Sequence, residues 1–176
     1  MNINCFKNLL VAGSMFFSTT AVQAAMPKVG DTAPLFTGQD QDGKTVKLAD
    51  LVGKKIVLLY FYPKDDTPGC TKEACSFRDN LDALAKDNVE VVGVSFDSAN
   101  SHQQFIAKYN LNFRLLADTD GKIADAYSVR MEGKNMDRRV SFLIGLDGKI
   151  VRVTDTGNPD IHLREMKAAI AGLKKT

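Results

Sequence analysis

The stretch that decides the fold is residues 60–75, which read YFYPKDDTPGCTKEAC. An apolar run before it predicts a buried strand, and apolar residues recur at helical spacing after it, which predicts a helix over 67–86. Thr67 suits the N-cap and Pro68 suits the first helical position. Cys70 therefore falls in the first helical turn, where free backbone N–H groups and the helix dipole favour a thiolate.

The middle of the chain predicts strands that alternate with helices. A buried strand over 55–61 precedes the helix 67–86, and a strand over 89–96 precedes a helix that Asn100 or Ser101 can cap. Two such steps in series imply a parallel sheet with right-handed crossovers.

The C-terminal part predicts a hairpin and a last helix. Asp147-Gly148 lies between the apolar runs 140–144 and 149–153, which is a strong hairpin pattern. Asn158-Pro159 opens a helix over 161–173, with its apolar side facing the core. We expect the inward residues to be Leu163, Met166, Ala169, Ile170 and Leu173.

Shorter elements complete the prediction. Two strands at 35–37 and 45–48 are joined by a turn through Asp42-Gly43, with irregular structure as the alternative. A strand at 114–117 and a helix at 123–127 form a separate insertion. Without that insertion the order is β-α-β-α-β-β-α. The fold class is therefore α/β, a thioredoxin-like fold with an N-terminal extension and an insertion before the C-terminal hairpin.

Residues 1–24 have the form of a secretory signal peptide. Lys7 supplies the positive charge, a short apolar run follows, and small residues precede Ala25. Cleavage after Ala24 leaves residues 25–176 as one domain of a periplasmic or secreted protein. An uncleaved anchor is the alternative, and the apolar run is short for a membrane helix.

The composition and the cysteines limit the function. The formal net charge is +2 and no basic block occurs, which argues against nucleic acid or a membrane as partner. Cleavage removes Cys5 and leaves Cys70 and Cys75, a pair that an exported chain usually bonds. A bridge over so short a loop stabilises little, so the pair favours redox chemistry. His102 and His162 are expected at the surface, and we expect no metal.

These residues resemble the peroxiredoxin family. The family's active-site loop has the pattern Pro-x-x-x-Thr/Ser-x-x-Cys, which is matched here by Pro63, Thr67 and Cys70. The stretch up to Cys75 is similar to the bacterioferritin-comigratory-protein, or Q-type, subfamily, whose second cysteine often lies five residues after the first. Arg139 matches the family's active-site arginine before the hairpin strand. The resemblance extends over most of the chain after the signal peptide.

The resemblance implies a thiol peroxidase that serves antioxidant defence. The Cys70 thiolate would attack the O–O bond of hydrogen peroxide or an organic hydroperoxide, and Cys75 would resolve the sulfenic acid as an intramolecular disulfide. A thioredoxin-like or other thiol reductant would complete the cycle, and sulfur carries the chemistry without a cofactor. The subfamily resemblance also implies a monomer or a weak dimer.

The same resemblance assigns supporting roles around the thiolate. Arg139 would stabilise the thiolate and the charge that develops on the peroxide oxygens. The Thr67 hydroxyl would bond between Cys70 and the peroxide, and Pro63 would shield the sulfur from water. The backbone N–H groups of Gly69 and Cys70 would bind a peroxide oxygen.

Several neighbouring residues have a structural alternative. Arg139 can instead be a surface cation, with the neighbouring Arg138 as the active-site arginine. Cys75 can be an inert helix residue. Glu73 can support Arg139 or simply favour the first helical turn. We expect the loop charges Lys64, Asp65 and Asp66 to be solvated, and Tyr62, Phe77 and Phe113 to serve packing.

The cysteine spacing gives a mechanistic hypothesis. Residues five apart in a regular helix are separated by roughly 8–9 Å between Cα atoms, whereas a disulfide needs less than about 7 Å. The helix around Cys70 and Cys75 must therefore unwind when the bridge forms.

Two other functions remain open on the sequence alone. A thiol–disulfide oxidoreductase shares the fold, but such enzymes use Cys-x-x-Cys and here four residues separate the cysteines. A redox-sensing domain shares the first chemical step, and it needs neither a recycling reductant nor repeated turnover.

Overall fold

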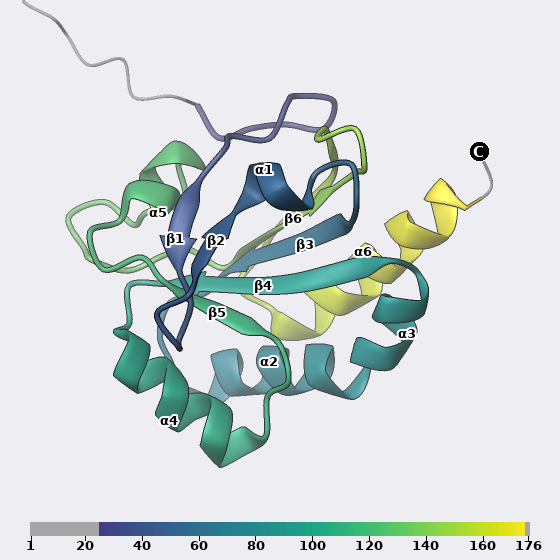
Figure 1. Ribbon diagram of the computed structural model, residues 1–176. Coiled ribbons are helices and arrows are strands. Elements are labelled where there is room, and N and C mark those ends of the chain that lie inside the picture. The colour runs from purple at the N-terminus through teal and green to yellow at the C-terminus, as the bar shows by residue number, and fades with distance from the viewer. Residues whose placement is uncertain (1–24, 175–176) are drawn as a thin grey trace, which may run out of the picture.

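The computed structural model describes residues 25–174, and the predicted signal peptide at 1–24 lies outside them. A five-stranded sheet with the order β5-β4-β3-β6-β7 forms the centre of the molecule (Figure 1), and β1 and β2 form a separate antiparallel pair. Among residues 25–174, no helix has both the length and the apolar character to cross a bilayer.

The elements follow one another as the alternating pattern predicts. In chain order they are β1 (Thr37–Gln39), β2 (Thr45–Lys47), α1 (Leu48–Leu51), β3 (Ile56–Phe61), α2 (Pro68–Asp79), α3 (Leu81–Lys86), β4 (Val89–Ser95), α4 (Ala99–Tyr109), β5 (Arg114–Ala117), α5 (Lys122–Ala126), β6 (Val140–Ile144), β7 (Ile150–Asp155) and α6 (Pro159–Leu173).

The central strand β3 explains the layered core. Leu58 and Tyr60 pack with the helices α2, α3, α4 and α6 on one face, whereas Val57, Leu59 and Phe61 pack on the face that carries α1, α5 and the β1–β2 pair (Figure 1). Successive side chains of a strand point to opposite faces. Because both faces are covered, the strand is a continuous apolar run, as buried parallel strands require.

The predicted fold class is confirmed, including the hairpin of β6 and β7 and the parallel pairing of β3, β4 and β5. The predicted helix 67–86 is wrong as one element, because Asn80 leaves helical geometry at φ −112° and ψ 5° and separates α2 from α3. The Asn80 side chain donates to the carbonyl oxygen of Ser76 at 2.9 Å, which competes with continuation of the helix.

Three further predictions are also wrong, on a helix cap, on a strand start and on the burial of one residue. Helix α4 is capped by Ser98, whose Oγ accepts from the N–H of Ser101 at 3.3 Å, and not by Asn100 or Ser101. Strand β1 begins at Thr37, two residues after the predicted start. Leu173 was expected to face the core, but it is 36% exposed at the last residue of α6.

Candidate active site

Cys70 lies where the central strand passes into a helix. Strand β3 ends at Phe61 and α2 begins at Pro68, with Thr67 in the N-cap position as predicted. The Cys70 side chain is buried, at 2% exposure, and packs beside Tyr60 in the core under α2. The sulfur is thus held in the first turn of a 12-residue helix, where the dipole favours negative charge.

Arg139, which lies 69 positions after Cys70 in the chain, contacts this sulfur. Strand β6 runs antiparallel to β3 and pairs Val140 with Phe61, which places Arg139 at the same end of the sheet as the Cys70 loop. Its Nη2 donates to Cys70 Sγ at 3.2 Å. Arg138 instead donates to Asp155 at 2.7 Å on the outside of the molecule, so Arg139 is the arginine that faces the thiol.

Glu73 occupies the second side of the Arg139 guanidinium. Nη1 of Arg139 donates to Oε2 of Glu73, whose side chain is fully buried. Burial raises the pKa of Glu73 to about 7, although the positive charge of Arg139 opposes that rise. Of the two roles considered for Glu73, the structure supports its contact with Arg139. The guanidinium is therefore shared between a thiol and a carboxyl group.

A histidine from the last helix lies behind Glu73. Nδ1 of His162 is 3.4 Å from Glu73 Oε1 and 2.8 Å from Ser141 Oγ, and Nε2 donates to the carbonyl oxygen of Thr156 at 2.9 Å. Burial lowers the pKa of His162. The prediction of a surface residue is wrong for His162, because α6 packs this side of its helix against the sheet.

A second buried histidine anchors the loop before Cys70. Oδ2 of Asp65 lies 2.9 Å from Nδ1 of His102 and accepts from Ser101 Oγ at 2.7 Å, while the Tyr62 hydroxyl donates to Oδ1 at 2.7 Å. Nε2 of His102 faces the carbonyl oxygen of Leu116 at 3.1 Å. Asp65 and His102 were predicted to be solvated, and both are buried because they satisfy each other's polar atoms.

Comparison with known proteins gives the same result as the motif. The chain matches the AhpC/TSA family over residues 29–153. It is 48% identical over 141 residues to peroxiredoxin Bcp of Escherichia coli K12, covering 77% of this chain and 90% of the relative. It is 45% identical over 145 residues to a putative Bcp peroxiredoxin of Coxiella burnetii, covering 79% of this chain and 95% of the relative. The chain belongs to the peroxiredoxin family.

Solved structures place this peroxiredoxin in the Bcp and Q group. The crystal structure of peroxidoxin BcpB from Mycobacterium tuberculosis superposes with a TM-score of 0.78 at 34% identity, covering 83% of this chain and 97% of that one. A cysteine-to-serine variant of Xylella fastidiosa PrxQ gives a TM-score of 0.72 at 30% identity, with 82% and 98% covered. The thioredoxin-like architecture is therefore the one that its relatives have.

The other predicted residues of this peroxiredoxin surround Cys70 with different contacts. The Thr67 hydroxyl donates to the carbonyl oxygen of Lys64 at 3.1 Å, so its hydrogen is used and only its oxygen is available to accept. Pro63 is half-buried in the loop. A Cβ added to Gly69 would lie 3.2 Å from Nη2 of Arg139, so a bare glycine backbone leaves the guanidinium its room.

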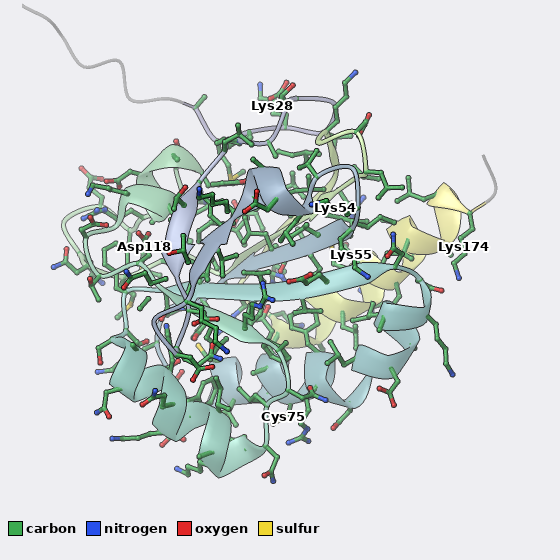
Figure 2. All side chains as sticks on the ribbon, in the orientation of Figure 1. Lys28, Lys54, Lys55, Cys75, Asp118 and Lys174 are labelled. Carbon is green, nitrogen blue, oxygen red and sulfur yellow. The ribbon has the colours of Figure 1, made fainter. Side chains whose placement is uncertain are left out.

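Cys75 lies on α2 (Figure 2). It follows Cys70 by about 1.4 helical turns, and both thiols are free. The Cys75 side chain is half-buried, so it is not the fully buried residue of the structural alternative, and its resolving role stays a prediction. Helix α2 is continuous from Pro68 to Asp79. The geometry that motivates the unwinding hypothesis is therefore present in the reduced protein.

Proposed function

We propose that this peroxiredoxin reduces hydroperoxides through Cys70 as the attacking thiolate and Cys75 as the resolving thiol. The observation that carries the proposal is the 3.2 Å contact from Arg139 Nη2 to Cys70 Sγ, at a helix N-terminus and away from bulk water. A positive charge at this distance stabilises the thiolate. The N–H groups of Arg139 and of the helix N-terminus also favour the negative charge that forms on the departing peroxide oxygen.

The cycle balances with two thiols and one peroxide. Cys70 sulfur attacks one peroxide oxygen, the O–O bond breaks, and the other oxygen leaves as water or an alcohol after it takes a proton. Cys75 then attacks the sulfenic sulfur, which forms the S–S bond and releases water. A dithiol reductant exchanges with this disulfide and restores both thiols, becoming a disulfide itself.

Arg139, Thr67, Pro63 and Gly69 form the surroundings of this reaction. The Cys70 thiolate holds the Arg139 guanidinium in position, and the guanidinium binds the peroxide oxygens. The Thr67 oxygen accepts a hydrogen bond from the peroxide hydrogen. Pro63 limits the approach of water to the sulfur. The backbone N–H groups of Gly69 and Cys70, in the first turn of α2, donate to a peroxide oxygen.

The physiological setting is part of the proposal. The form of residues 1–24 supports export to the periplasm or the medium, where a thioredoxin-like protein is the fitting reductant. We propose hydrogen peroxide and organic hydroperoxides as substrates, and a monomer or weak dimer as the active form. Fractionation of cells that express the full chain, with N-terminal sequencing of the product, tests export and a cut after Ala24.

Catalytic turnover is the experiment that tests the function. Peroxide is added in excess to the protein and a thioredoxin-like reductant, with Cys70→Ser as the control. We expect many molecules of peroxide to be consumed per protein molecule, and none above background in the control. A single turnover with no recycling would contradict the proposal and support the redox-sensing alternative.

A further inference from the structure

The pair Glu73 and His162 has a hydrogen-bond arrangement that requires one more hydrogen. Nε2 of His162 donates to the carbonyl oxygen of Thr156 at 2.9 Å, so Nε2 carries a hydrogen. The neutral ring then has a single lone pair, at Nδ1, and Ser141 Oγ lies 2.8 Å from this atom. Nδ1 also faces Oε1 of Glu73 at 3.4 Å.

Oε1 of Glu73 is the acceptor left without a donor. It is buried and has no hydrogen-bond partner within residues 25–174, whereas Oε2 is bonded by Arg139. Two buried lone pairs that face each other are unfavourable, and a hydrogen on either atom turns the contact into an attraction. The geometry therefore calls for one proton between Oε1 and Nδ1.

The position of Glu73 connects this proton to the redox chemistry. Glu73 lies between Cys70 and Cys75, inside the part of α2 that must change shape before the two sulfurs can bond. When these turns unwind, the Glu73 carboxyl leaves Arg139 and His162 and reaches solvent. A carboxyl group in water is ionised at neutral pH.

We propose that Glu73 and His162 hold one proton in the reduced enzyme and release it to solvent when α2 unwinds to form the Cys70–Cys75 disulfide. Disulfide formation releases water from the sulfenic acid and the Cys75 thiol, and the proton from Glu73 is additional to that balance. His162 stays neutral, and once the Glu73 carboxyl has left, its Nδ1 lone pair is free to accept from Ser141. Glu73 and His162 are thus positioning residues, and the inference rests on the proposed role of Cys75.

Other charged groups around the pair agree with a proton on the carboxyl side. Burial raises the pKa of Glu73 and lowers that of His162, and Arg139 lowers both. Glu165 and Asp155 raise the pKa of His162, and the charge of Glu73 raises the pKa of the buried Tyr60 on β3. Since the pKa of Glu73 is about 7 in the folded protein and about 4.3 for a glutamate in water, the release is expected between these two pH values and fades outside them.

Infrared difference spectroscopy of reduced minus disulfide protein tests the proposal. At pH 6 we expect the carbonyl band of a protonated carboxyl that is present only in the reduced form. The band should be absent in Glu73→Gln, shifted in frequency in His162→Gln, and lost from the unmodified protein at pH 9. The last measurement needs no variant, so it holds even if a substitution disturbs folding.

A second buried carboxyl provides the matched control. Burial raises the pKa of Asp137 to about 8, but Asp137 lies outside the unwinding helix. Asp137→Asn should therefore leave the difference band unchanged. A band that persists in Glu73→Gln, or that is unshifted in His162→Gln, would overturn the proposal.

The intact mass of the same samples distinguishes a failure of the proton release from a failure of the proposed role of Cys75. Disulfide formation without a change in the carboxyl band would overturn the proton release and leave the peroxidase cycle intact. Absence of the disulfide would overturn the role of Cys75, and this inference with it.

Discussion

Nη2 of Arg139 lies 3.2 Å from Sγ of Cys70, although the two residues are 69 positions apart in the chain. The same guanidinium is bonded by Glu73 through Nη1. Its charge is therefore divided between the thiol and the carboxyl. We therefore expect the reactivity of Cys70 to depend on the contact between Glu73 and Arg139.

Replacement of Arg139 should slow the reaction with peroxide. Arg139→Lys keeps the charge but cannot donate to Cys70 and Glu73 with one planar group. Loss of a charge-assisted hydrogen bond of roughly 1.5–3 kcal/mol predicts a rate of Cys70 oxidation about 10–100 times lower. Stopped-flow measurement of the first oxidation step checks this. Arg138→Lys is the control, and an equal loss in both variants would contradict the assignment of Arg139.

Oxidation should unwind α2 locally. Amide hydrogen exchange over residues 68–78 is expected to become faster in the disulfide form, because the helix cannot hold Cys70 and Cys75 close enough to bond. Exchange in β4, which is paired on both sides by β3 and β5, is the internal reference and should stay slow. Identical protection of residues 68–78 in both redox forms would show that the bridge forms without unwinding.

Asp65 should contribute far more to stability than its neighbour. Asp65→Asn replaces one acceptor oxygen of a buried carboxyl that bonds His102, Ser101 and Tyr62, so a buried donor loses its partner, which costs roughly 1–3 kcal/mol. Asp66→Asn is the matched control, because Asp66 binds Lys108 and Tyr109 at the exposed surface. Thermal unfolding of both variants measures the difference. Equal melting temperatures would mean that the buried network does not anchor the active-site loop.

Asp137 should make the protein less stable as the pH rises. Its two carboxyl oxygens are buried without a partner in the described part of the chain, and burial raises its pKa from 3.8 to about 8. The folded state thus keeps a proton that the unfolded state loses, so stability falls between these two values. We expect Asp137→Asn to remove much of this fall, with a gain of roughly 5 °C or more in Tm at pH 8.

The control for this pH effect is an exposed aspartate. Asp82→Asn, in the first turn of α3, removes a carboxyl of the same charge that lies at the surface. Its curve of Tm against pH should parallel that of the unmodified protein. A parallel curve for Asp137→Asn would mean that the buried carboxyl ionises without penalty.

The sequence predicts the fold and the centre of the site because both depend on local pattern. The apolar runs of β3 and β4, the turn at Asp147-Gly148 and the Thr67-Pro68 helix start all act over a few residues. The position of Cys70 in the first helical turn follows from the helix start at Thr67-Pro68. Arg139 is identified by its place before β6, and antiparallel pairing with β3 then brings it to Cys70.

The buried polar pairs could not be predicted in this way. His102 and Asp65 are 37 positions apart, and Glu73 and His162 come from different helices. The sequence spacing of a single histidine does not indicate that its side chain will contact a carboxyl group in the folded core. Asn80 is a similar case, because the break between α2 and α3 depends on one side-chain bond to Ser76 and leaves the apolar spacing unchanged.

The most direct test of the account is the mass of the reduced protein after one equivalent of hydrogen peroxide, with Cys70→Ser and Cys75→Ser beside it. The account predicts rapid loss of two hydrogens, mapped to a bridge between Cys70 and Cys75. It predicts no change in Cys70→Ser and a gain of one oxygen on Cys70 in Cys75→Ser. An unmodified protein whose mass does not change, or a Cys70→Ser variant that reacts equally fast, would contradict it.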